Sequence, residues 1–234
     1  MHQTLKQNSS LDPKPEACLS SRTYINSSHP DIIEFAMDAT RGIEDPISKA
    51  IALNKQVRDH VKYSPYRSFS ALEMYYANTC LGDGIGCCIE KAALLAAAAR
   101  VVNIPARVGF ANIKNHLSSP RLLDLLETDI FYWHGYTELW LNKRWVKATP
   151  TFDVDLCKKF NVPPLEFDGK NDAVFHPYDT SGQKHMEYLA HCGSYSDVPA
   201  ATIMEDLQKK YPKLIEAVTD RSNSFHQEAE PLSS

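Results

Sequence analysis

The chain has 234 residues, of which 43% are hydrophobic and 23% charged, and its formal net charge is −4. This length can bury a full core, and the absence of a dense lysine or arginine run argues against a nucleic-acid partner. No apolar run approaches the ~18 residues of a membrane-spanning helix. The polar N-terminus also lacks the apolar centre of a signal peptide. We therefore expect no membrane partner and a cytoplasmic protein whose thiols stay reduced.

In chain order, the spacing of apolar and helix-breaking residues predicts helices first and strands afterwards. The helices are expected within 27–42, 44–61, 86–102 and 199–210, the strands at 106–113, 134–141 and 144–151, and mostly loop at 63–86. This order is typical of an α+β fold. We expect one domain over 23–220, with mobile polar tails at 1–22 and 221–234.

Two adjacent cysteines, Cys87 and Cys88, stand at the front of the third predicted helix. The glycine-rich segment before them allows a tight turn, and the free N–H groups of a helix N-terminus favour a thiolate. This segment alone is equally compatible with two buried structural thiols. The sequence has no CxxC pair and no helical HExxH motif, so we expect no metal and no cofactor.

A second segment, residues 131–157, reads as a hairpin that turns at Asn142–Lys143. A two-residue loop there pairs Trp140 with Trp145, Glu138 with Lys147 and His134 with Thr151. In that register His134, Thr149 and Asp153 share one face. A histidine beside an acid can serve a thiol as its base, although a surface hairpin with an ordinary histidine would give the same pattern.

Together the two segments resemble the transglutaminase-like superfamily. The stretch "GCCIEKAALLAAAARVVNIPARVGF" is similar to its nucleophile block, and "HGYTELWLNKRWVKATPTFD" is similar to its histidine block. The resemblance covers roughly residues 28–155. It implies a papain-like α+β core, in which N-terminal helices precede a nucleophile helix packed on an antiparallel sheet. The implied chemistry is acyl transfer from an amide through a thioester on cysteine.

The resemblance assigns the site residues individually. Cys88 is the expected nucleophile, because it has an alanine four positions on and a glycine two positions before, and His134 takes the place of the motif histidine. The usual third-member aspartate is replaced by Thr149. We expect Asp153 to orient His134, with Thr149 as the alternative. The backbone N–H of Cys88 is an expected oxyanion donor. The hydroxyl of Tyr76 or Tyr75 can be a second donor, with Tyr76 as our choice, although aromatic packing is the favoured role of both residues.

Two nearby charges are expected to have structural roles. Glu90 is expected to be a solvated charge in the first helical turn, and Arg107 is expected to tie the start of a strand to a carboxylate. Lys91 can be either a similar solvated charge or a residue that orients substrate.

The expected function is hydrolysis of an amide or peptide bond in a protein or peptide substrate, in preference to cross-linking. The alternative is a transglutaminase-like module that has lost turnover and binds a partner. The oligomeric state is left open.

Overall fold

The computed structural model describes residues 12–116, 118–174 and 186–218. Its α-helices are α1 Pro30–Ala39, α2 Pro46–His60, α3 Ala77–Asp83, α4 Cys88–Val101, α5 Pro120–Leu126, α6 Val154–Lys159, α7 Ala200–Lys210 and α8 Pro212–Ala217. Its strands are β1 Lys62–Tyr63, β2 Ile85–Gly86, β3 Ala106–Asn115, β4 Ile130–Leu141, β5 Arg144–Ala148 and β6 Met186–Tyr195. Within those residues, no helix combines the length and the apolarity needed to cross a bilayer.

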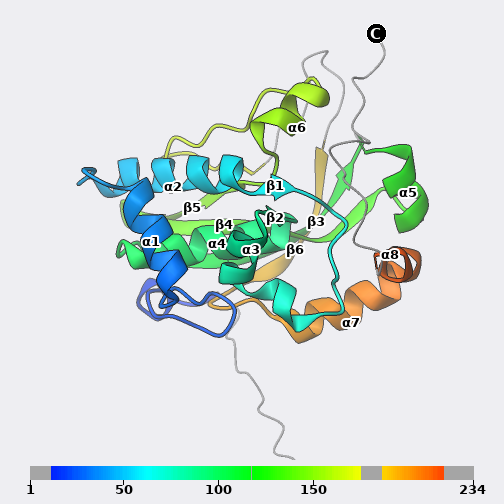
Figure 1. Ribbon diagram of the computed structural model, residues 1–234, viewed down its shortest axis with the longest axis horizontal. Helices are drawn as coiled ribbons and strands as arrows, with labels where there is room; N and C mark the ends of the chain where they lie inside the picture. The colour runs from blue at the N-terminus through cyan, green and yellow to red at the C-terminus, as the bar shows by residue number, and fades with distance from the viewer. Residues whose placement is uncertain (1–11, 117, 175–185, 219–234) are drawn as a thin grey trace, which may run out of the picture.

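A four-stranded antiparallel sheet forms the β layer, with the strand order β5-β4-β3-β6. α4 packs against β3 and β4, and on its other sides it contacts α1, α2 and α3, as Figure 1 shows. β1 and β2 form a small parallel pair, and β2 directly precedes α4 in the chain. The expected α+β class, with a nucleophile helix packed on an antiparallel sheet, is therefore confirmed.

α4 is the central helix because its sequence has almost no polar face. Every residue from Ile89 to Arg100 is buried, and five of the last eight are alanines, which let neighbouring backbones approach closely. Arg100, at the end of the helix, donates to the carbonyl oxygens of Ser20, Ala106 and Ser196. One buried guanidinium thus joins three separate segments to the end of α4.

The predicted hairpin has the expected register where it forms, since Trp140 pairs with Trp145 and Glu138 pairs with Lys147. The third predicted pair, His134 with Thr151, is not formed, because the ladder between β4 and β5 ends at Thr137 and Ala148. The second strand ends earlier than predicted, at Ala148, and Pro150 follows two residues later without an N–H for the ladder. The sequence analysis did not predict β6, α5 or α6, and it placed α3 within a loop.

Part of the segment 12–22, which we expected to belong to a mobile tail, contacts the strands of the sheet. Cys18 is fully buried, the N–H of Asp12 donates to the carbonyl of Ser194, and Arg107 donates to the carbonyl of Pro13. The predicted boundaries of the domain and of its tails stay predictions. Residues 1–11 and the predicted tail 221–234 lie outside the described residues.

Candidate active site

α4 begins at Cys88, and Cys87 is its N-cap residue. The carboxylate of Glu90 accepts the backbone N–H of Cys87 at 2.8 Å, which closes a capping box at the helix start. Arg67 pairs with the same carboxylate through its Nε and Nη2. Glu90 is fully buried, so the expectation of a solvated charge is wrong. Its role is to fix the turn that carries the two thiols.

The two adjacent thiols have opposite protonation tendencies. Burial raises the pKa of the Cys87 thiol well above its usual value. A hydrogen bond from Cys87, the charge and hydrogen bonding of His134, and the backbone N–H of Gly135 together hold the pKa of Cys88 well below its usual value, against the effect of burial. Cys88 is therefore the more acidic of the two thiols, and the imidazole of His134 is a group that can accept a thiol proton.

In β4, His134 lies next to a β-bulge. Between the pairs Ala111–His134 and Ile113–Phe131, β4 has one residue more than β3. Trp133 adopts a left-handed conformation at this point, with φ of 59°. Asn112 accepts the backbone N–H of Trp133 at 3.2 Å, and the indole N–H of Trp133 donates to Asp206 at 2.8 Å. A bulge of this kind redirects the next side chain, here His134.

Close packing brings α4 and β4 together beside the bulge. A Cβ added to Gly135 would lie 2.9 Å from the Cα of Ile89 and 3.0 Å from the carbonyl oxygen of Cys88. Two residues further along β4, the Thr137 hydroxyl donates to the carbonyl of Ala92 at 2.8 Å. The absence of a side chain at Gly135 therefore allows α4 to approach the strand that carries His134.

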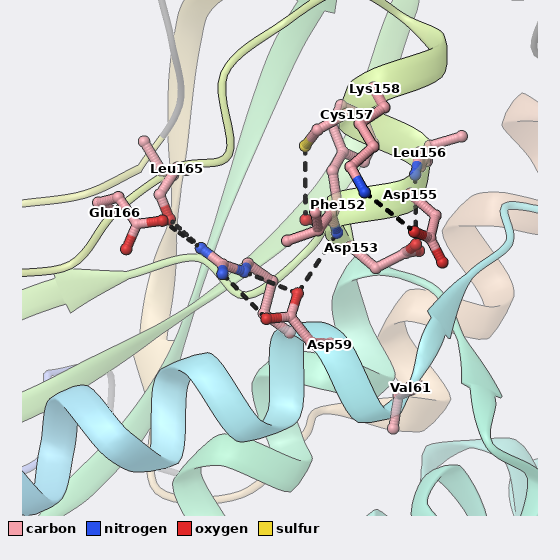
Figure 2. A network of polar contacts seen from close by, with 12 residues as sticks. Asp59, Val61, Phe152, Asp153, Asp155, Leu156, Cys157, Lys158, Leu165 and Glu166 are labelled. Atoms are coloured by element: carbon pink, nitrogen blue, oxygen red, sulfur yellow. Dashed lines mark hydrogen bonds and ion pairs between the residues drawn. The ribbon is translucent and has the colours of Figure 1, made fainter.

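Asp153, the expected third member, lies at the start of α6. Its carboxylate accepts the N–H of Leu156 at 3.3 Å and the N–H of Tyr63 at 3.0 Å, and it is 3.5 Å from the ammonium group of Lys62. Figure 2 shows this N-terminus of α6, where the neighbouring Asp59 also accepts the N–H of Val154. These contacts give Asp153 a capping and bridging role. The carboxylate does not hydrogen-bond His134 Nε2, which has no partner among the described residues.

Thr149, the alternative third member, lines a cavity of about 30 Å³ together with His134 and Thr151. The side-chain hydroxyls of both threonines and the Nε2 atom of His134 are buried and have no hydrogen-bond partner among the described residues. The structure therefore brings Thr149 and His134 to one cavity without a direct hydrogen bond between them.

A second, apolar pocket of about 40 Å³ lies on the Cys88 side of His134. Its walls come from the loop after β1, the start of α4, α5, β4, α7 and α8. They comprise Tyr63, Pro65, Phe69, Cys87, Cys88, Ile89, Leu122, Leu126, Phe131, Tyr132, His134, Leu207, Tyr211 and Leu214. Burial raises the pKa of Tyr63 well above its usual value, and a charge on Cys88 adds to this effect. The sequence analysis did not predict that Tyr63 lines this pocket. Tyr76, whose hydroxyl was expected to be an oxyanion donor, is not among the lining residues.

The two remaining charges have structural contacts. Arg107 pairs with Glu138 and Asp12, which confirms the expected carboxylate partner. Lys91 is fully buried, and its ammonium group donates to the carbonyls of Arg58 and Val61 at the end of α2. Neither a solvated charge nor a substrate contact describes Lys91. In the part of the chain that the structure describes, no group of three or more metal-ligating side chains is close enough to bind an ion.

Comparison with known proteins gives a family and a similar fold. The sequence profile of the transglutaminase-like superfamily matches residues 33–150. A crystal structure of a candidate cysteine protease from Cytophaga hutchinsonii has a TM-score of 0.51 and 20% identity, over 82% of this chain and 50% of that chain. This chain thus spans about half the length of the Cytophaga protein.

A candidate protease from Parabacteroides distasonis is similar over 57% of this chain and 25% of its own, with 18% identity and a TM-score of 0.37. The comparison with curated proteins gave no match.

Proposed function

Because the chain belongs to the transglutaminase-like superfamily, we propose that it is a cysteine-dependent acyl-transfer enzyme that hydrolyses an amide or peptide bond. The observation that carries this proposal is the Cys88 thiol in the first turn of α4, whose pKa is held well below its usual value beside His134. A thiolate present at neutral pH is the nucleophile that amide acyl transfer needs.

In the first half of the proposed reaction, the Cys88 thiolate attacks the substrate carbonyl carbon and forms a C–S bond. The carbonyl oxygen becomes an oxyanion, and the backbone N–H of Cys88 is the donor we assign to it, because first-turn N–H groups lack helical partners. The C–N bond then breaks, and protonated His134 gives its proton to the leaving amine. The acyl group remains on Cys88 as a thioester.

In the second half, a water molecule resolves the thioester. His134, now neutral, takes a proton from the water as its oxygen attacks the thioester carbon, and the C–S bond breaks. The acid leaves, and the thiolate and protonated histidine are restored. We assign water as the second nucleophile because it needs no binding site of its own beside Cys88.

The apolar pocket beside Cys88 supports an apolar group on the acyl side of the scissile bond. The group attached to the attacked carbonyl must lie next to the thiol, and the leucine and aromatic side chains there would desolvate it. A carboxylate placed in such a pocket loses its hydration without gaining a partner, which is costly. The favoured substrate is therefore a peptide or amide whose acyl-side residue is apolar.

A generic acyl donor tests the proposal without knowledge of the natural substrate. Incubation with p-nitrophenyl butyrate is expected to release a burst of p-nitrophenol and to add a butyryl group to the Cys88 peptide, as seen by mass spectrometry. Cys88→Ala should remove both signals. Cys192→Ser, which alters another partly exposed thiol, should leave them unchanged.

Two further measurements refine the assignment. Mono-p-nitrophenyl succinate should acylate Cys88 more slowly than the butyrate ester, by about tenfold or more. If adding a primary amine such as cadaverine converts the product from acid to amide, the enzyme transfers acyl groups to amines and the hydrolysis assignment fails.

A transglutaminase-like binding module without turnover remains the second candidate. It is favoured by one observation, namely that the Nε2 atom of His134 has no carboxylate partner among the described residues. An unacylated Cys88 after long incubation with the butyrate ester would support this second candidate.

A further inference from the structure

Three residues that line the cavity behind His134 each have a buried polar atom without a hydrogen-bond partner among the described residues. These atoms are the Nε2 atom of His134 and the hydroxyl oxygens of Thr149 and Thr151. Each of the three residues is about 95% buried. The other lining residues, among them Phe152, Val162 and Leu165, contribute apolar side chains.

This arrangement is costly unless something satisfies the three atoms. A buried polar group without a partner costs about 1–3 kcal/mol, so three of them would consume a large share of the stability of an ordinary domain. A cavity of about 30 Å³ exceeds the roughly 10–15 Å³ that a bound water needs. Buried waters typically make two to four hydrogen bonds, which fits the three atoms present.

A direct side-chain contact does not solve the problem. Thr149 and Thr151 do not hydrogen-bond the imidazole, and Asp153 is occupied by the N–H groups of Tyr63 and Leu156. The unpartnered atoms and the shared cavity therefore suit a small polar bridge between the ring and the two hydroxyls.

We propose that this cavity binds an ordered water through which Thr149 and Thr151 position the imidazole of His134. The Nε2–H group donates to the water oxygen, and the water donates its two hydrogens to the threonine oxygens. This holds the proton on Nε2 and leaves Nδ1 as the nitrogen that exchanges a proton with Cys88. The two threonines are thus positioning residues, and the third member of the site is a neutral water.

The proposal rests on the proposed function for its catalytic meaning, but the bound water can be tested directly. A crystal structure at a resolution that orders waters should show density within about 3.2 Å of Nε2 and of both threonine oxygens. A cavity without such density, or one filled by a side chain, would overturn the proposal.

A kinetic test measures the positioning role through the rate of Cys88 alkylation by iodoacetamide as a function of pH. The double variant Thr149→Val/Thr151→Val should lose at least about tenfold in rate near pH 7, because an imidazole that loses its orienting hydrogen bond supports the thiolate poorly. Thr149→Ser/Thr151→Ser keeps both hydroxyls and should stay within about twofold of the wild-type rate.

A buried threonine elsewhere serves as the control for stability. Thr40 is 5% exposed, and its hydroxyl donates to the carbonyl of Ala36 in α1. Thr40→Val should lower the melting temperature without changing the pH profile of alkylation. If the valine double variant also keeps the wild-type profile, the threonines have no positioning role and the proposal fails.

The same data separate this proposal from the proposed function. A wild-type protein that never acylates Cys88 would refute the enzyme assignment, whereas the crystallographic water would still stand. A wild-type protein that acylates Cys88, with valine variants that react equally well, would refute only the positioning role.

Discussion

At the residue scale, two adjacent cysteines differ because they occupy different positions of one helix terminus. Cys87, the N-cap residue, is 2% exposed and keeps its proton. Cys88, one residue later, lines the pocket beside His134 and meets the N–H of Gly135. Both cysteines line this pocket, but His134 and the N–H of Gly135 lower the pKa of the Cys88 thiol, whereas burial dominates at Cys87.

The first prediction follows from these opposed pKa shifts. Because the folded-state pKa of Cys88 lies well below its usual value, iodoacetamide should label Cys88 at pH values where an ordinary thiol, with a pKa of about 8.5, stays protonated. His134→Ala removes the opposing charge and should shift the rate profile to higher pH. Mass mapping of the labelled peptide checks the site, and dominant labelling of Cys87 would contradict the assignment.

The second prediction concerns Asp153. Its bonds to the N–H groups of Tyr63 and Leu156 tie β1 to α6, so Asp153→Ala should lower the free energy of unfolding by about 1–3 kcal/mol. Asp153→Asn keeps an acceptor and should lose less. Urea titration measures both effects.

The pH profile of Cys88 alkylation distinguishes this role from the one first expected. If Asp153 only supports the fold, that profile in Asp153→Asn stays the same as in the wild type. A profile displaced in Asp153→Asn but not in the Thr149 and Thr151 variants would return Asp153 to the position of the third member.

At the scale of the elements, the distance between α4 and β4 decides whether the thiol reaches the imidazole. The bulge at Trp133 redirects His134, and Gly135 admits the backbone of the helix. These two features are adjacent in sequence and act on the same contact. A short segment of β4 therefore sets the geometry of the site.

The third prediction tests this contact. Gly135→Ala introduces a methyl group less than 3.0 Å from the backbone of Ile89, which cannot move as a flexible side chain would. The change should cost about 1–3 kcal/mol of stability and slow the acylation of Cys88.

Gly82→Ala is the matched control, because its added methyl meets no atom within 4 Å and lies within α3. It should leave acylation unchanged and stabilise the helix by up to about 1 kcal/mol. Equal rates in the two variants would show that the close approach at Gly135 is not needed.

At the scale of the whole molecule, the pocket beside Cys88 forms only where distant parts of the chain meet. α5, α7 and α8 contribute Leu122, Leu207 and Leu214 to it, and Figure 1 shows these three helices together at one side of the sheet. Away from the pocket, buried charged side chains connect other elements, as Arg107 of β3 does with Glu138 of β4. Lys91 is the cation that joins α4 to the end of α2.

The fourth prediction uses Lys91 to follow stability with pH. Burial lowers the pKa of its ammonium group to about 8, whereas an unfolded lysine titrates near about 10.4. Between these values the unfolded chain binds more protons than the folded chain, so raising the pH favours folding through this group. The free energy of unfolding of the wild type, relative to that of Lys91→Met, should therefore rise by up to about 1.4 kcal/mol per pH unit above pH 8.

Urea unfolding of both proteins at pH 7, 8 and 9 measures this difference, and other groups that titrate in both proteins cancel. Lys55→Met, at an exposed position of α2, is the control and should show a constant difference. A constant difference for Lys91→Met as well would mean that the lysine titrates normally in the folded protein.

The sequence by itself determined the parts of this protein that depend on local patterns. The apolar helix behind Cys88 and the register of the hairpin follow from residue spacing and from turn residues, and the structure has both. The family likeness also rests on motifs that are contiguous in the chain, which is why it could be seen before the fold.

Tertiary structure alone decided what each polar residue near the site does. Asp153 was predicted from the hairpin face to reach His134, yet it bonds Tyr63, which lies 90 residues away in the sequence. Glu90 and Lys91 are buried because Arg67 and the end of α2 satisfy them, and no local pattern indicates those partners. Burial and hydrogen bonding in this site arise between segments distant in sequence, so their outcome becomes visible only when the chain is folded.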